Sequence, residues 1–455
     1  MSQLVTPDTL HRTAKVMMDS AIVGSAQAAM DRLLGLALHV DLDPRVATSP
    51  TRQAALLTVI NCARRCFLGG VTVSGCDGIP LTVPMPGCDD LSAAIEFWGG
   101  RRVGQAPPGV IAIELGPRSS GGSAAVFRPT FEGWTGAVLG IQGSSRLPES
   151  SENVLSGVFM GAMAVAEAFQ CATHTNVFAG RRDVGLSLWD LDPETDWRQA
   201  PAGPPLEYLP SSLWLIGLGH LGQAYLWTLG LLPFAKASEV QLMLQDFDQL
   251  VIANDSTSPL TKTDLIGVRK TRAMAAWCER RGFDVRLIER PFSSDLRIGG
   301  DDPRVALVGV DKPEPRACME DVGFDVVVEA GLGKGWQDYL DGQVHSFPSQ
   351  ISAAEHWGRR IPMATLVPPV PSYVQLSAAG LDACGVLELA SRSVGAAFVG
   401  CASAAIVLAE LVRLLHGGPR HALVDWSLRD LSQRRVFLAS RGSPIPRYTL
   451  AHVPS

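Results

Sequence analysis

Short apolar runs alternate with longer segments of helical spacing in the second half of the chain. The apolar runs of strand length are, in order, Leu213–Ile216, Val240–Leu244, Val285–Ile288, Val305–Val310 and Val326–Glu329. Between them, apolar residues at helical spacing reach to about Leu231 and cover Val268–Arg281. Strands that alternate with helices are typical of a parallel, doubly wound sheet. The pattern therefore predicts an α/β fold for this half.

The first half repeats this organisation more faintly. Residues 52–75, "RQAALLTVINCARRCFLGGVTVSG", predict a helix followed by a strand, and residues 109–115 predict a later strand. The most apolar stretches, 153–169 and 393–411, are rich in small residues, hold one Glu each near their C-terminal ends, and close one half of the chain each. They fall short of or barely reach the ~20 residues of a membrane span, so we predict buried core helices and no membrane partner. The sequence thus indicates an internal repeat, in which each half of the chain is closed by one apolar helix.

A Pro-rich, acidic stretch separates the two halves and is typical of a linker. We therefore expect a first domain over 1–190, a linker over 191–212 and a second domain over 213–455.

Composition narrows the class of protein without naming a function. With 455 residues, 46% of them hydrophobic and 18% charged, the chain is globular and large enough for more than one core. Its formal net charge of −6 offers no basic surface for nucleic acid. The nine cysteines form no ladder of even spacings, and no basic and apolar leader opens the sequence. We expect reduced thiols and a cytoplasmic location.

A glycine turn marks the first strand–helix junction of the second half. Gly217, Gly219 and Gly222 form Gly-x-Gly-x-x-Gly, in which the glycines allow a tight turn, a close phosphate and close helix packing. Asp246 and Asp248 follow about 20 residues later, where a ribose-binding acid is expected. NAD and ATP both remain open at this point. The first half has no such turn, which predicts that it has lost its nucleotide site.

Three polar residues further along favour a triphosphate over a dinucleotide. Asn254 follows the second Asp, and Lys270 opens a helix, where its ammonium can meet phosphate oxygens. Asp311 follows a strand at the sheet edge where α/β proteins bind ligands, and a carboxylate there can hold Mg²⁺. Each residue also has an ordinary alternative role, as a loop cap, a surface charge or a turn former.

Together, "GLGHLG", "DFDQLVIAN", "GVRK" and "VGVDKPEPR" resemble the adenylation domain shared by MoeB, ThiF and the ubiquitin-activating enzymes, over most of 211–418. The two-half activating enzymes of bacterial ubiquitin-like conjugation operons of the Bil type are the most similar form. The resemblance implies two Rossmann-like adenylation-type domains, the first degenerate and the second active, forming a pseudo-dimer with doubly wound, mostly parallel sheets. It also implies that Asp246 binds the ATP ribose, that Asn254 and Lys270 contact phosphates, and that Asp311 binds Mg²⁺.

The resemblance extends to a nucleophile and departs at two points. In thioester-forming relatives the nucleophilic cysteine precedes the last helix close to a Gly-Val-Leu, as Cys384 does here. A thiolate suits that step, although a free cysteine is more often a small buried hydrophobe. The arginine that often follows the Asn by three residues is Thr257 here. Paired Cys-x-x-Cys motifs are absent, so we predict no structural zinc.

The resemblance also implies that a basic residue from the first half reaches the phosphates of the second. Arg12 is our first choice, Lys15, Arg64 and Arg65 are the other candidates, and an exposed surface charge is the alternative for Arg12.

The implied function is ATP-dependent activation of a ubiquitin-like protein that ends in glycine. Adenylation of its C-terminus would precede thioester formation on Cys384 and transfer to a conjugating enzyme. Three alternatives stay open: a MoeB- or ThiF-like adenylyltransferase for sulfur transfer or peptide modification that stops at the acyl-adenylate, an NAD-dependent oxidoreductase, and a binding module without activity.

Overall fold

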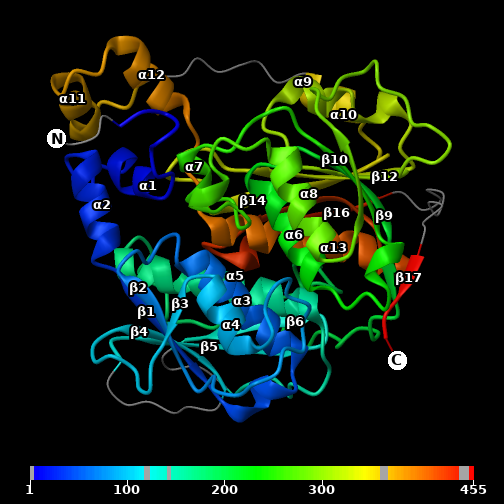
Figure 1. Ribbon diagram of the computed structural model, residues 1–455, viewed down its shortest axis with the longest axis horizontal. Coiled ribbons are helices and arrows are strands. Elements are labelled where there is room, and N and C mark those ends of the chain that lie inside the picture. Colours follow the sequence, from blue (N-terminus) through cyan, green and yellow to red (C-terminus); the bar gives the residue numbers. More distant parts are fainter. Residues whose placement is uncertain (1–4, 117–122, 141–144, 359–366, 440–449, 455) are drawn as a thin grey trace.

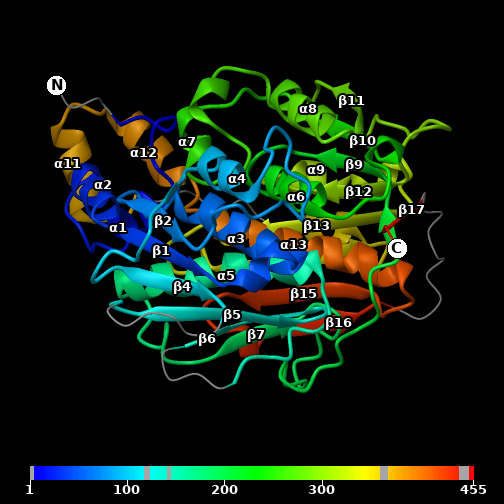
Figure 2. The ribbon, with the colours of Figure 1, turned by 60° about the horizontal axis from the view of Figure 1, so that its bottom comes forward.

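The computed structural model describes residues 5–116, 123–140, 145–358, 367–439 and 450–454. The structure contains two large sheets, and four long helices lie in the middle of the molecule between them (Figure 1, Figure 2). These helices are α3 (Pro50–Ala63), α5 (Val154–Thr173), α6 (His220–Leu231) and α13 (Ala397–Leu415).

The first sheet belongs to the first half of the chain. Its spatial order is β3 (Gly100–Arg102), β2 (Gly70–Ser74), β1 (Ala37–Leu42), β4 (Ile111–Leu115), β5 (Val126–Glu132), β6 (Thr135–Leu139) and β7 (Val184–Ser187). Neighbouring strands are parallel from β3 to β5, and the last two strands are added antiparallel.

The second sheet repeats this order and adds one strand. It runs β11 (Asp284–Ile288), β10 (Gln241–Gln245), β9 (Ser212–Ile216), β12 (Val305–Val308), β13 (Val326–Leu332), β14 (Asp341–Phe347), β15 (His421–Ser427) and β16 (Arg435–Leu438). Pairing is again parallel up to β13 and antiparallel beyond it. In each sheet the first strand along the chain lies in the interior, β1 between β2 and β4 and β9 between β10 and β12. The chain then continues into a helix of the central layer, α3 after β1 and α6 after β9. The predicted α/β fold of two mostly parallel, related sheets is confirmed.

The two apolar stretches of the sequence are the core helices α5 and α13, as predicted. They are long and apolar enough to cross a membrane, but 94% and 89% of their most apolar windows are buried inside the protein. Helix α5 packs against α3 and α13, and α13 packs against α6. The small residues allow this closeness, because a side chain at Gly157 or Gly161 would meet backbone oxygens of α3 at 2.4 and 2.6 Å. Protein covers both helices, so neither leaves a face for lipid.

The stretch predicted as a linker is fixed to both halves. The indole of Trp134 in the first half donates to the carbonyl of Pro204 at 2.7 Å. Arg434 in the second half donates to the carbonyl of Leu191 at 2.9 Å. The stretch ends in β8 (Tyr208–Pro210), which pairs with β17 (Leu450–His452). These contacts make it part of the packed structure.

An N-terminal arm, residues 5–34, connects the first half to the second. It contains α1 (Ala14–Asp19) and α2 (Ala26–Leu34), which lie beside α11 (Pro371–Ala378) and α12 (Ala383–Ser391) in both views (Figure 1, Figure 2). The Tyr373 hydroxyl of α11 donates to Asp19 at 2.7 Å, and that of Ser372 donates to the Met18 carbonyl at 3.2 Å. The arm also accepts a hydrogen bond from Ala253 in α7 (Ile252–Asp255), through the carbonyl of Asp8 at 2.7 Å.

The shorter helices complete the layers. They are α4 (Leu91–Phe97), α8 (Lys270–Arg280), α9 (Pro313–Ala317) and α10 (Ala353–Gly358).

Candidate functional site

The turn between β9 and α6 has the geometry that its glycines predict. Gly217 adopts a positive φ of 85°, and a side chain at Gly222 would lie 1.9 Å from the Gly217 carbonyl oxygen. At Gly219, by contrast, a Cβ would find nothing within 4 Å. Two glycines are thus required by the turn itself, while the third leaves open space at the N-terminus of α6. The start of a helix offers free backbone N–H groups and a positive dipole end to an anion in that space.

Asp246 ties this turn to the end of β10. Its carboxylate accepts hydrogen bonds from the backbone N–H of Leu218 at 2.7 Å and of Asp248 at 2.9 Å. The Lys270 ammonium at the start of α8 lies 2.8 Å from the Asp248 carboxylate and 3.8 Å from that of Asp246. Asp246 and Lys270 are largely buried, whereas half of the Asp248 side chain is exposed. The structure therefore brings these three predicted residues together beside the turn.

Asn254 lies on α7 and has a local role. Its side-chain oxygen accepts from the backbone N–H of Val251 at 2.9 Å and so caps this short helix. Its amide N–H groups are not needed for the cap, which leaves donors for a ligand. Thr257, three residues on, is buried.

Asp311 follows β12 at the carboxyl end of the sheet. Its side chain is exposed, with no ion pair or side-chain hydrogen bond to any other part of the chain that the structure describes. A free carboxylate there fits Mg²⁺, which usually takes one or two carboxylates together with substrate phosphates. Mg²⁺ itself stays a prediction.

Sequence reasoning missed Arg316, which fixes the backbone next to Asp311. This buried guanidinium donates to the carbonyl of Val310 at 2.8 Å and to that of Ala330 in β13 at 2.6 Å, and lies 3.3 Å from Glu329. No local pattern points to it, because two of its partners, Glu329 and Ala330, come from β13.

The four candidate basic residues of the first half have different environments. Lys15 forms a buried ion pair with Asp19 and a cation–π contact with Tyr373. Two further candidates at the end of α3 bind the loop after α7: Arg64 pairs with Asp255 at 2.9 Å, and Arg65 donates to the carbonyls of Ser258, Pro259 and Thr261.

Arg12 keeps one end of its guanidinium unpaired. Its Nη2 donates to the Pro7 carbonyl at 3.1 Å, while Nη1 is buried and finds no acceptor among the described residues. Its backbone N–H donates to Ser256 next to α7 at 3.1 Å. Of the four, Arg12 is therefore the candidate whose charge stays available for a ligand, in line with its choice from the sequence. Its contact with phosphate remains a prediction.

Cys384 lies in the first turn of α12 and is exposed, whereas the other eight cysteines are buried or partly buried. Burial raises the pKa of Cys62, Cys66 and Cys278 and so disfavours their thiolates. Cys384 is thus the thiol most accessible to a protein substrate. Part of the preceding segment, 359–366, lies outside the described residues.

His220, which lies within the glycine motif, packs against α13. A side chain at Gly400 would lie 2.4 Å from its Nε2, so the ring packs into the start of α13. Burial lowers the pKa of His220 to about 4, with the charge of Arg65 acting in the same direction. The imidazole is a neutral packing element that fixes α6 to α13.

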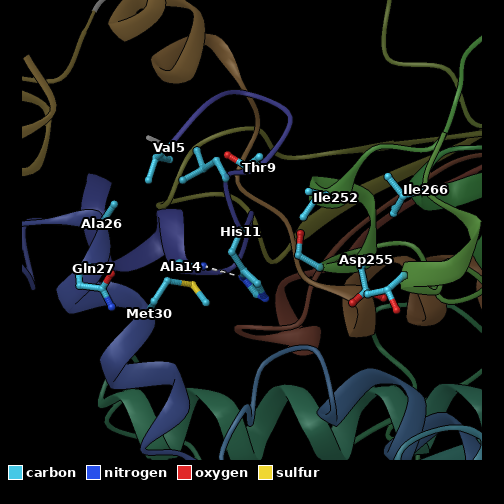
Figure 3. A pocket seen from close by; sticks show the side chains of 13 residues that line it. Val5, Thr9, His11, Ala14, Ala26, Gln27, Met30, Ile252, Asp255 and Ile266 are labelled. Carbon is cyan, nitrogen blue, oxygen red and sulfur yellow. Dashed lines mark hydrogen bonds between the residues drawn. The ribbon is translucent and has the colours of Figure 1, made fainter. Parts of the chain in front are cut away.

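A cavity of about 260 Å³ lies between the N-terminal arm and α7 (Figure 3). Its wall is mostly apolar and includes Val5, Met30 and Ile252 (Figure 3). His11 points into the same region, and burial lowers the pKa of His11 to about 4. None of the predicted site residues lines this cavity, so it is separate from the glycine turn.

The corresponding place in the first half is filled by the protein itself. At the start of α3, a carboxylate oxygen of Glu152 accepts from the backbone N–H of Thr51 and from the Ser49 hydroxyl, both at 2.9 Å. Behind it, the buried Glu149 carboxylate pairs with three arginines, namely Arg45, Arg52 and Arg146. A helix start favours a nearby anion, and at α3 that anion is the Glu152 carboxylate of the protein itself.

The fold defines a protein of two related α/β halves. Among the described residues, the first half fills the start of its first helix with Glu152, and the second leaves the start of α6 open beside acidic and basic groups. Comparison with known proteins gives the family. Models of the BilD N-terminal domain and the BilD C-terminal domain match residues 37–188 and 209–418. The bacterial E1-like protein BilD of Collimonas sp. (strain OK412) is 39% identical over 429 residues, which are 93% of this chain and 92% of that protein. The chain therefore belongs to the BilD family of E1-like proteins.

Solved structures give weaker likenesses. E. coli MccB is 12% identical, with 71% of this chain and 94% of that chain covered and a TM-score of 0.33. E. coli tRNA N6-threonylcarbamoyladenosine dehydratase, TcdA, is 14% identical, with 46% and 86% covered and a TM-score of 0.28. TM-scores this low add nothing to the topology described above.

Proposed function

We propose that the second half adenylates the C-terminal carboxylate of a ubiquitin-like protein with ATP, and that Cys384 then takes the acyl group as a thioester. The observation that carries this proposal is the open helix start at Gly219, flanked by Asp246, Asp248 and Lys270, in a chain of an E1-like family. The other half has the same fold but a filled helix start, which supports a ligand role for the open one.

Each residue near the turn has a feature that suits the proposed ligand. The carboxylate of Asp246 retains lone pairs beyond its two backbone hydrogen bonds and can accept from ribose hydroxyls. Lys270 and the amide of Asn254 supply donors for phosphate oxygens. Asp311 would hold Mg²⁺, whose charge offsets that of the phosphates.

The first step is an in-line displacement at phosphorus. A carboxylate oxygen of the protein C-terminus forms a bond to the α-phosphorus of ATP, the bond from that phosphorus to the bridging oxygen breaks, and pyrophosphate leaves with the electron pair. The donors of the turn and the Lys270 ammonium oppose the charge that builds up on the oxygens. A glycine end suits this step because it has no side chain to obstruct the approach.

The second step is acyl transfer to sulfur. The Cys384 thiolate attacks the carbonyl carbon of the acyl-adenylate, the carbon–oxygen bond to phosphate breaks, and AMP leaves. The thiol proton has gone to solvent beforehand, so the step balances. A conjugating enzyme would accept the acyl group from the exposed thioester.

The proposal is tested by incubating the protein with Mg·ATP, labelled pyrophosphate and candidate ubiquitin-like proteins that end in glycine. We expect exchange of label into ATP that depends on the partner, together with an adduct that a reducing agent cleaves. Asp311→Ala is expected to lose exchange. Cys384→Ala is expected to keep exchange and lose the adduct, with Cys88→Ala, at a partly buried thiol, as the control.

The same experiment separates the alternatives. An adenylyltransferase that stops at the acyl-adenylate would show exchange but no cleavable adduct in the wild type. An oxidoreductase would bind NAD and show no exchange. Exchange in Asp311→Ala at the wild-type rate would contradict the metal assignment.

A further inference from the structure

Two arginines from distant parts of the chain lie on segments that meet at the seam between the N-terminal arm and α12. Arg12 belongs to the arm, and Arg392 directly follows the last residue of α12. Each is held at one end only: Arg12 Nη2 by the Pro7 carbonyl at 3.1 Å, and Arg392 Nη2 by Glu388 at 2.8 Å. The positions of the side chains are thus defined without neutralising both charges locally.

Each guanidinium also has an N–H group that the protein leaves unsatisfied. Arg12 Nη1 and Arg392 Nε are both shielded from solvent, and neither meets an acceptor within the described ranges. A buried donor on a charged group is costly to leave without a partner. Burial and then the charge of Arg392 lower the pKa of Arg12 to about 10, and Asp8 opposes this only in part. The charges of Arg12 and Arg392 thus act against each other, and the Asp8 and Glu388 carboxylates leave these two N–H groups without an acceptor.

This seam lies next to the open helix start of the second half. The Thr13 hydroxyl, adjacent to Arg12, donates to the Gly395 carbonyl at 3.0 Å, which joins the arm to the segment after Arg392. A side chain at Gly395 would lie 3.0 Å from the Thr257 methyl and 3.8 Å from His220. His220 is the first residue of α6, directly after Gly219. The segments that carry the two arginines are thus in contact with the start of α6 and with the loop after α7.

We propose that Arg12 and Arg392 together bind the terminal phosphates of ATP, the part that leaves as pyrophosphate. The inference rests on the proposed function for the identity of the ligand and adds Arg392 as a binding residue. Two guanidinium forks offer several parallel N–H donors to phosphate oxygens, a geometry for which arginine is the preferred residue. A phosphate between them would satisfy both free donors and replace repulsion by attraction. Because AMP lacks these phosphates, the pair distinguishes ATP from AMP.

The test measures dissociation constants of Mg·ATP and AMP by titration calorimetry on the full chain without a protein partner. For Arg392→Ala and for Arg12→Ala we expect ATP to bind about tenfold more weakly, as for loss of a charged hydrogen-bond donor, and AMP to change by less than about twofold. Arg392→Lys keeps the charge and is expected to recover part of the loss. Arg435→Ala is the matched control, because that exposed arginine pairs with Asp425 on the edge of the second sheet.

The outcomes are distinct. Equal weakening of ATP and AMP, or unchanged ATP affinity in Arg392→Ala, overturns the inference. A loss in Arg12→Ala alone overturns the pairing. In the double variant Arg12→Ala/Arg392→Ala, a loss that differs from the product of the single losses supports a shared phosphate, whereas independent losses count against it. A wild-type protein that binds no ATP would instead contradict the proposed function itself.

Discussion

The two halves of the molecule have the same strand order and the same central helices, yet they treat the start of the first helix in opposite ways. In the second half, α6 begins after a glycine turn whose middle glycine faces open space. In the first half, α3 begins after Ser49, and Glu152 occupies its free backbone N–H. The dipole and the unpaired donors of a helix start favour an anion in either case. The comparison shows two ways in which one fold can treat the unpaired N–H groups of a helix start. They can be left open for a ligand, or they can be paired with a carboxylate of the protein itself.

The difference extends to the charges behind each helix start. In the first half Glu149 neutralises arginines and is nearly fully buried, with 2% of its side chain exposed. In the second half Asp311 is exposed with no ion pair among the described residues. The first arrangement serves stability, whereas the second leaves charge available. Mutations at the helix start should therefore change mainly the stability in the first half and mainly the affinity for ATP in the second.

The largest effect on ATP affinity is expected at Gly222. A methyl group there would lie 1.9 Å from the Gly217 carbonyl oxygen, so Gly222→Ala must open the turn. Because displacement by about 1 Å costs on the order of 100-fold in a positioned site, we expect ATP affinity to fall by about that factor. The melting temperature should fall as well. Titration calorimetry and thermal unfolding measure the two effects.

Gly219→Ala separates binding from folding at the same turn. A Cβ at this position meets no atom within 4 Å and φ is −83°, so the melting temperature should stay unchanged while ATP affinity falls. Thr51→Ala at the start of α3 is the matched control and should leave ATP affinity at the wild-type value. Wild-type ATP binding by Gly222→Ala would contradict the role of the turn.

The largest effect on stability is expected in the first half. Glu149→Ala leaves the buried Arg52 without its partner, which should lower the free energy of unfolding by about 3–5 kcal/mol. The affinity for ATP should stay within about twofold of the wild-type value, because Glu149 and its arginines pair with each other in the first half and do not face the ligand. Urea unfolding and titration calorimetry test both statements, with Glu194→Ala on the surface as the control. A loss of ATP affinity without a loss of stability would show that the Glu149 cluster serves ligand binding, contrary to the role assigned to it here.

A smaller effect is expected at Lys270, whose ammonium pairs with Asp248 at 2.8 Å beside the turn. Lys270→Ala removes one charged donor, so we expect ATP to bind about tenfold more weakly. Lys236→Ala, at an exposed lysine paired with Glu239, should have no effect. If both variants bind ATP like the wild type, Lys270 is a structural residue that positions Asp248.

The last effect is a pH dependence of stability that distinguishes the two helix starts. Burial lowers the pKa of His220 at the start of α6 from 6.5 to about 4, whereas Pro50 begins α3. Between these pKa values the unfolded chain binds the proton more readily than the folded chain, so stability falls as pH drops from 7 to 5. His220→Gln should reduce this fall in the urea midpoint. An equal fall in both proteins would show that His220 does not contribute.

Much of the fold follows from local sequence patterns. The strands of the second half lie where their apolar runs predict, and the helix and strand of 52–75 are present as α3 and β2. The glycine turn is recognisable because the restriction at Gly222 comes from a residue five positions earlier. Asp246 and Lys270 also lie close to the turn, since the carboxyl ends of parallel strands meet at one edge. Periodicity and topology were enough for these features.

Features that depend on distant contacts could not be predicted. No local pattern relates Arg12 to Arg392, or Thr51 to Glu152, because each pair meets only after the chain has folded. The anchoring of the 191–212 stretch depends on Trp134 and Arg434 for the same reason. His220 belongs to the glycine motif, but its ring packs against Gly400 of α13, a contact that no local pattern predicts.

The N-terminal arm also affects how the protein can be synthesised. Its partner Ser372 lies 354 residues after Met18, and ribosomes add roughly 5–20 residues per second, so roughly 20–70 s pass before this contact can form. During that time Val16, Met17 and Met18, which are buried in the finished protein, lack part of their final cover. Helix α1 is synthesised long before α11 and is therefore among the last to reach its place, and a chaperone that binds short apolar segments would find its target there.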